Sequence, residues 1–134
     1  MRVVLDTNIF ISGIFWENNS CSAIIDAWQA GKLTLVSSLE IVQELVDTLR
    51  DFRIIMPEEM IEAWRKTLME HALLVAPAEK LALVKDDPDD DKFFEAAVAG
   101  HAQYLVSQDK QVLNIPTFRG IKTIHPKIFV KLLS

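Results

Sequence analysis

Short apolar segments alternate with amphipathic segments along most of this chain, and no other feature constrains its fold as strongly. The first apolar segment, residues 2–6, reads Arg-Val-Val-Leu-Asp: β-branched, and ending in a polar residue as buried strands often do. Further segments of this kind recur along the chain. The sequence thus predicts five short strands, at residues 2–6, 33–36, 73–75, 104–107 and 121–124.

The segments between these strands carry apolar residues at helical spacing. Residues 20–30 form such a stripe and stop at Gly31, a residue typical of the position just past a helix end. Ser37-x-x-Glu40 predicts a capping box that opens the next helix, and Asp89 is predicted to cap the helix that contains Phe93 and Phe94. A helical turn at 8–13 and helices at 57–71 and 127–133 complete the prediction.

Strands and helices that alternate in this way favour an α/β fold, with a mostly parallel sheet of about five strands and helices on both faces. A length of 134 residues, 50% of them hydrophobic, predicts one domain over residues 1–134. In such sheets, ligands bind beyond the carboxyl ends of the strands. The functional residues are therefore expected at that edge.

Charge is unevenly distributed. The formal net charge is −5, yet the segment after Asp109 has no acid and carries +5, which leaves −10 on residues 1–109. Five aspartates and Glu95 lie among residues 86–95 beside a single lysine, and a divalent cation would explain so many acids in one place. The single cysteine, Cys21, excludes an intrachain disulfide and a cysteine-based zinc cluster.

The sequence also predicts where the protein resides. Its apolar stretches are far shorter than the ~18–20 residues of a membrane-spanning helix. Met1 and Arg2 lead directly into the first strand rather than into a signal-peptide core. The expected location is the cytoplasm, without membrane association.

Carboxylates stand at or near the predicted strand ends. Asp6 closes the first strand, Asp109 follows the fourth, and Glu44 lies two turns into the helix after the second. Asp90 and Asp91 begin the helix that leads into the fourth strand. Oxygen ligands without a supporting histidine spacing favour Mg²⁺ or Mn²⁺ over zinc.

Each carboxylate also has a simpler interpretation. Asp6 would suit the cap of the helical turn, Glu44 shares an acidic stripe that water would solvate, and Asp109 beside Lys110 is an ordinary turn pair. Aspartates 89–91 are favourable first-turn acids for a helix dipole. The hypothesis of a metal site rests on all four places falling at one edge of one sheet.

Four motifs in order resemble the PIN-domain family of ribonucleases, in particular its VapC-like toxin branch. They are Asp6-Thr7-Asn8 with Ser12, Glu44 within Val-Gln-Glu-Leu, the stretch from Asp87 to Ala97, and Leu-Val-Ser-Gln-Asp ending at Asp109. The resemblance extends over nearly the whole chain. It implies a three-layer α/β/α sandwich and a metal-dependent endoribonuclease that hydrolyses RNA phosphodiester bonds.

The resemblance also implies roles for individual residues. The acidic quartet would be Asp6, Glu44, Asp91 and Asp109, holding Mg²⁺ or Mn²⁺, and Asp90 is the second choice for the third position, with Asp87 a further option. The polar supports would be Asn8, Ser38 and Ser107. We expect RNA contacts from Lys110, Arg119, Lys122 and Lys127, unless these basic residues only favour solubility. The implied partners are a second copy of the chain and a cognate antitoxin protein.

Three other functions compete with the nuclease. A catalytically silent PIN scaffold that binds RNA or a protein would keep the fold without needing a full acidic quartet. A haloacid-dehalogenase-like phosphatase would use Asp6 as nucleophile, but such enzymes have a second aspartate two residues later, where this chain has Asn8. A phospho-acceptor receiver domain fits less well still. Such domains carry an acidic pair before the end of the first strand, and this chain has none there.

Overall fold

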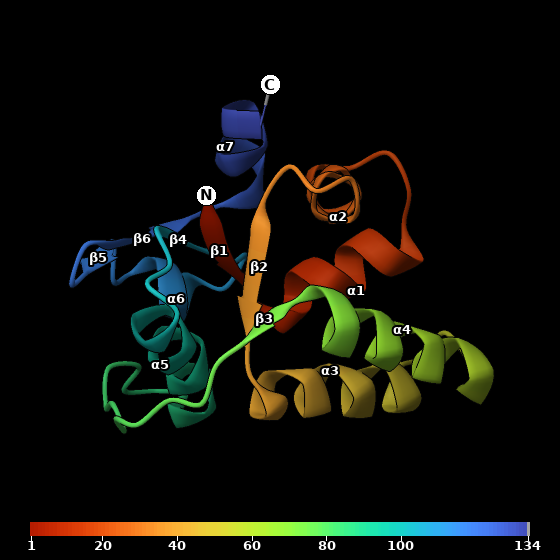
Figure 1. Ribbon diagram of the computed structural model, residues 1–134, viewed down its shortest axis with the longest axis horizontal. Helices are drawn as coiled ribbons and strands as arrows, with labels where there is room; N and C mark the ends of the chain where they lie inside the picture. Colours follow the sequence, from red (N-terminus) through yellow and green to blue (C-terminus); the bar gives the residue numbers. More distant parts are fainter. Residues whose placement is uncertain (134) are drawn as a thin grey trace.

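The computed structural model describes residues 1–133 and contains a six-stranded sheet between two layers of helices (Figure 1). Strand order across the sheet is β3-β2-β1-β4-β6-β5, and every neighbouring pair is parallel except β5 with β6. The strands are β1 (Arg2–Leu5), β2 (Thr34–Ser37), β3 (Leu73–Leu74), β4 (Tyr104–Val106), β5 (Thr117–Phe118) and β6 (Ile121–Ile124).

The helices cover both faces of this sheet. Figure 1 shows α5 on one side of the central strands and α1, α2 and α4 on the other. The longer helices are α1 (Thr7–Phe15), α2 (Ser20–Gln29), α3 (Leu39–Asp51), α4 (Glu58–His71) and α5 (Asp91–Ala99), and the short ones are η1 (Pro88–Asp90), α6 (Lys110–Leu113), α7 (Pro126–Phe129) and η2 (Val130–Leu133). The three-layer α/β/α prediction is confirmed.

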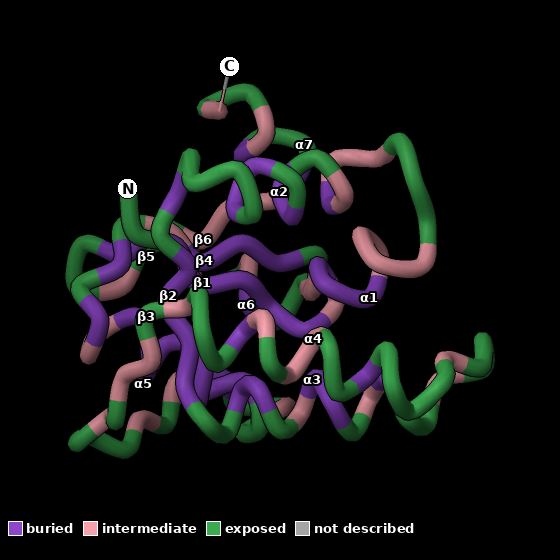
Figure 2. The backbone as a smooth tube through the Cα atoms, turned by 45° about the vertical axis from the view of Figure 1, so that its right-hand side comes forward, coloured by how far each residue is buried: buried purple, intermediate pink, exposed green. Residues whose placement is uncertain are grey.

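Alternation along β1 divides the hydrophobic core into two parts. Val3 and Leu5 pack with the buried residues of α1 to α4, whereas Val4 packs against Phe93 and Phe94 of α5. Successive side chains of a strand point to opposite faces, so one apolar strand supplies both cores. Figure 2 shows the result, with buried residues concentrated along the central strands and the inner sides of the helices.

Gly13 allows α2 to pack closely against α1. A Cβ atom at this position would lie 2.9 Å from the carbonyl oxygen of Cys21 and 2.9 Å from Cγ1 of Ile25. Both distances are far shorter than a methyl group tolerates. The close approach fixes α1, the helix that follows the first strand.

The structure corrects several sequence-based details. Ser38, not Ser37, caps α3, because Ser37 is the last residue of β2 and the Ser38 hydroxyl accepts from the amide of Ile41 at 3.3 Å. Asp89 caps no helix, since it lies inside the 3₁₀ turn η1. The short elements α6 and β5 were not predicted, and the predicted C-terminal helix is divided between α7 and η2.

The helices also bear on the question of membranes. Among residues 1–133, none of them is long and apolar enough to span a bilayer.

Candidate metal site at the carboxyl edge of the sheet

Asp6 lies at the centre of the carboxyl edge, directly after β1. Its carboxylate is 5% exposed, and its Oδ2 accepts from the Ser107 hydroxyl at 2.6 Å and from the Asn8 amide at 3.3 Å. Burial raises the pKa of Asp6 to about 6, against the lowering effect of these hydrogen bonds, and the charges of Glu44 and Asp109 add to the rise. Other acids therefore surround an already buried carboxylate.

Asn8 and Ser107 join the ends of the two central strands. The Ser107 hydroxyl donates to Asp6 and accepts from the backbone amide of Asp109 at 3.0 Å, while the side-chain Oδ1 of Asn8 accepts from the backbone amide of Gln108 at 3.3 Å. The strands β1 and β4 are hydrogen-bonded neighbours, so their following residues meet here. Two of the three predicted polar supports, Asn8 and Ser107, thus contact Asp6 or the loop that carries Asp109.

Asp90 approaches the same place from the turn before α5. Oxygens of Asp87, Asp90 and Asp109 all lie within 4.8 Å of one another. Burial first of all, and then the charge of Asp6, a hydrogen bond with Asp109 and the charge of Asp87, together raise the pKa of Asp90 to about 8. Its Oδ2 is buried without a hydrogen-bond partner among the described residues. This group of acids is crowded and incompletely satisfied.

Asp91 points elsewhere. Its Oδ1 accepts from the backbone amides of Leu83 at 3.0 Å and Val84 at 2.9 Å, which ties the segment before η1 to α5. Asp91 was preferred to Asp90 for the third acidic position on sequence grounds, but in the structure it is Asp90 that lies beside Asp6 and Asp109. Adjacent residues at the start of a helix project about 100° apart, so only one of them can face Asp6.

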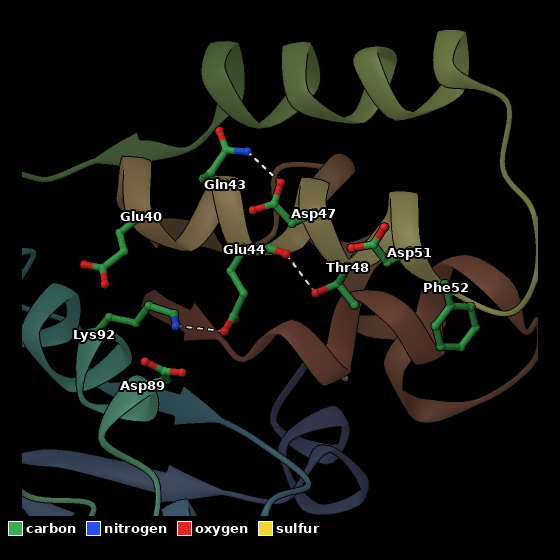
Figure 3. Close-up of a pocket in the computed structure, with 9 residues that line it drawn as sticks. All are labelled: Glu40, Gln43, Glu44, Asp47, Thr48, Asp51, Phe52, Asp89 and Lys92. Carbon is green, nitrogen blue, oxygen red and sulfur yellow. Dashed lines mark hydrogen bonds and ion pairs between the residues drawn. The ribbon is translucent and has the colours of Figure 1, made fainter.

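Glu44 borders the site but is held by other side chains. One carboxylate oxygen accepts from the Thr7 hydroxyl, and the other lies 2.8 Å from the ammonium of Lys92, whose side chain is 8% exposed. Burial alone lowers the pKa of Lys92, but the hydrogen bond and charge of Glu44, with Asp89 and Glu40, raise it above its usual value. Figure 3 shows Lys92 reaching from α5 toward Glu44 on α3, with Asp89 nearby.

Two adjoining cavities lie along this edge. A cavity of about 320 Å³ is lined by Asp6, Glu44 and Asp90 together with polar residues of α1. A larger cavity of about 620 Å³ runs along α3 and is lined by Lys92, Glu44 and several other acidic residues (Figure 3). Glu44 and Thr48 line both cavities. The acids thus face open space that a substrate could enter.

The remaining predicted residues fall into two groups. Lys110 follows Asp109 directly along the chain, and Lys127 lines a cavity with Ser12 and with Gln108, the residue before Asp109. Arg119, in the turn before β6, donates two hydrogen bonds of 2.8 Å to the carboxylate of Glu79. Lys122 pairs in register with the first residue of β4, at the opposite edge of the sheet. Ser38 acts at a distance, by capping the helix that bears Glu44.

Sequence reasoning did not assign roles to Thr7 and Lys92. Both residues belong to the sequence motifs: Thr7 stands between Asp6 and Asn8, and Lys92 directly follows the run of aspartates. Their partner Glu44 is distant in sequence, so no local spacing could connect them. The tertiary structure alone joins α1, α3 and α5 at this point.

Comparisons with known proteins concern the family and the fold of the chain. A sequence model of the PIN domain matches residues 2–111, and no curated protein matches the chain. The fold is similar to a chain of VapBC2 from Rickettsia felis bound to a DNA fragment from its promoter, at 14% identity and TM-score 0.63, covering 93% of this chain and 98% of that one. It is likewise similar to VapBC-1 from nontypeable Haemophilus influenzae, at 17% identity, TM-score 0.63 and coverage of 95% and 99%. A chain of FitAB bound to an IR36 DNA fragment matches at 13% identity and TM-score 0.61, with coverage of 92% and 94%.

Proposed function

The chain belongs to the PIN domain family, and from this premise we propose that it is a metal-dependent endoribonuclease, the toxin component of a toxin–antitoxin pair. The observation that carries the proposal is the meeting of Asp6, Asp90 and Asp109 at the carboxyl edge of the sheet. Acids crowded in this way repel one another unless a cation or protons neutralise them. Hydrolysis of a phosphodiester is the reaction that such a site best serves.

The acidic residues suit a hard divalent cation. Oxygens of Asp87, Asp90 and Asp109 lie within 4.8 Å of one another, and the unpartnered Oδ2 of Asp90 is a ligand atom without another role. Carboxylate oxygens are the ligands that Mg²⁺ and Mn²⁺ prefer, so we assign Asp90 and Asp109 to the ion, with Asp6 and Asp87 beside them. When bound, the ion supplies Lewis-acid stabilisation of charge on the phosphate.

Asp6 has a separate role in this proposal. Ser107 and Asn8 both donate to its Oδ2, which fixes the orientation of the carboxylate. A carboxylate held in one orientation can position a water molecule for in-line attack and accept its proton. Ser107 also bonds to the amide of Asp109, so one hydroxyl aligns both acids.

Two basic residues are assigned to the RNA backbone. Lys110 follows Asp109, and Lys127 shares a cavity with Gln108, so we place both beside the site, where they would neutralise phosphates of the bound RNA. Arg119 and Lys122 have no part in this proposal, because Arg119 is paired with Glu79 and Lys122 lies at the other edge of the sheet.

The toxin assignment rests on the structural neighbours. VapBC2 and VapBC-1 are similar to this chain over nearly their full length, at TM-scores of 0.63. By analogy with them, we propose a small antitoxin protein as partner and a homodimer as the functional unit. The corresponding test is expression in a bacterial host, where the wild-type chain should arrest growth and Asp6→Asn should not.

RNA cleavage is the direct test of the proposed activity. The purified chain is incubated with structured and single-stranded RNAs in Mn²⁺, in Mg²⁺ and in EDTA, beside Asp6→Asn, Asp90→Asn and the exposed control Asp26→Asn. We expect metal-dependent cleavage by the wild type and Asp26→Asn only. Absence of cleavage by the wild type under every condition, with RNA still bound, would instead favour the silent scaffold.

A further inference from the structure

The two sides of the acidic site differ in how their charge is balanced. On the α5-turn side, Asp90 faces Asp6, Asp87 and Asp109, all carboxylates, and keeps an unpartnered buried oxygen. On the α3 side, Glu44 has a cation from the chain itself, the ammonium of Lys92 at 2.8 Å. The groups that act on Asp90 among the described residues are thus all acidic, whereas Glu44 is paired with a cation.

Both oxygens of Glu44 are engaged. Lys92 takes Oε1, and the hydroxyl of Thr7 donates to Oε2. The Lys92 side chain is 8% exposed and the Glu44 side chain 32%, so the pair is partly shielded from water. A divalent ion placed on this carboxylate would have to lie close to an ammonium, and the repulsion between the two cations is stronger where water is partly excluded.

We propose that Lys92 is a positioning residue that, by pairing with Glu44, keeps this carboxylate out of the metal ligand set and restricts the site to one divalent ion on the side of Asp90 and Asp109. The inference rests on the proposed metal-dependent function and deepens it. Lys92 is well placed for this role because it follows Asp90 and Asp91 at the start of α5. The same turn therefore delivers an acid to the ion and an ammonium to Glu44.

Neighbouring charges explain why the ammonium stays in place. Glu40 and Asp89 also face Lys92, so its charge is balanced by three acids rather than by Glu44 alone (Figure 3). These acids line the 620 Å³ cavity along α3. Lys92 thus separates this acidic groove from the carboxylates assigned to the ion.

Calorimetric titration with Mn²⁺ tests the proposal on the intact chain. We expect one ion per wild-type chain. Glu44→Gln should also bind one ion, with an affinity within about threefold of the wild type, since the carboxylate charge that it removes is already balanced by Lys92 and is not a ligand of the ion. Asp90→Asn should weaken binding by about 10–100-fold or more, because losing a ligand costs at least what losing an outer partner does. Lys92→Met frees Glu44, and a second ion should then bind.

Two further variants separate this role from folding. Lys92→Arg keeps the ion pair and should again bind one ion. The double variant Glu44→Gln/Lys92→Gln removes both charges together and leaves neither of them unpaired. It therefore serves if Lys92→Met does not fold, and it should also bind one ion. Thermal melts in EDTA establish that each variant is folded.

The outcomes distinguish this inference from the proposed function. Two ions on the wild type, or loss of binding in Glu44→Gln, would overturn the role of Lys92 while metal-dependent RNA cleavage could still stand. One ion, unaffected by Glu44→Gln, without cleavage of any RNA would support Lys92 and contradict the nuclease. A wild-type chain that binds no Mn²⁺ would contradict both.

Discussion

Replacing Asp6 by asparagine should make the metal-free protein more stable at neutral pH, although it removes a residue assigned to the site. The pKa of Asp6 rises from 3.8 to about 6 on folding, mainly through burial. The folded chain therefore holds this proton more tightly than the unfolded chain does. Stability from this group is greatest below pH 3.8 and is lost as the pH rises toward 6.

The magnitude follows from the same shift. At about 1.4 kcal/mol per pKa unit, keeping Asp6 ionised at pH 7 costs about 3 kcal/mol of unfolding free energy. Asparagine at this position avoids this cost, and its side-chain oxygen can still accept from the Ser107 hydroxyl. That hydrogen bond is weaker than the one to a carboxylate, which lowers the unfolding free energy by about 1 kcal/mol. We expect Asp6→Asn to be about 2 kcal/mol more stable than the wild type at pH 7 and within about 1 kcal/mol of it at pH 4.

Urea denaturation in EDTA at the two pH values measures this difference. Asp26→Asn, an exposed change on α2, is the matched control and should stay within about 0.5 kcal/mol of the wild type at both. If Asp6→Asn is less stable than the wild type at pH 7, or if the difference is the same at both pH values, the buried charge does not control stability here.

Three other changes test separate parts of the structure. Asp91→Ala should cost about 2–4 kcal/mol in urea denaturation, because one buried and one partly buried amide lose their acceptor. It should nevertheless bind Mn²⁺ more tightly than Asp90→Asn does, and the reverse ranking would return the third position to Asp91. Lys110→Ala should weaken RNA binding and reduce its salt dependence by about one phosphate contact, whereas Lys122→Ala, at the other edge of the sheet, should change neither. Gly13→Val should lower the melting temperature by separating α1 from α2, and an unchanged melting temperature would show that the two helices tolerate the added bulk.

Local patterns account for most of the fold. Short, nearly continuous apolar runs predicted the central strands, because parallel strands covered on both faces carry little polar surface. The stripe of residues 20–30 and its glycine stop predicted α2 within one residue of its end. The failures came where a choice between neighbours depends on packing, as with Ser37 and Ser38 at the start of α3. Two-residue strands such as β5 exist only because β6 lies beside them.

By itself the sequence determined the α/β class, and it determined that Asp6, Asp109 and one acid of the run before Phe93 would meet, since carboxyl ends of neighbouring parallel strands share an edge. Tertiary structure alone decided which acid that is. Asp91 is drawn to the amides of Leu83 and Val84, which leaves Asp90 facing Asp6. The tertiary structure also decided that Glu44 pairs with Lys92. These residues lie on two different helices that are far apart in the sequence, so no local sequence pattern indicates that they are close in space.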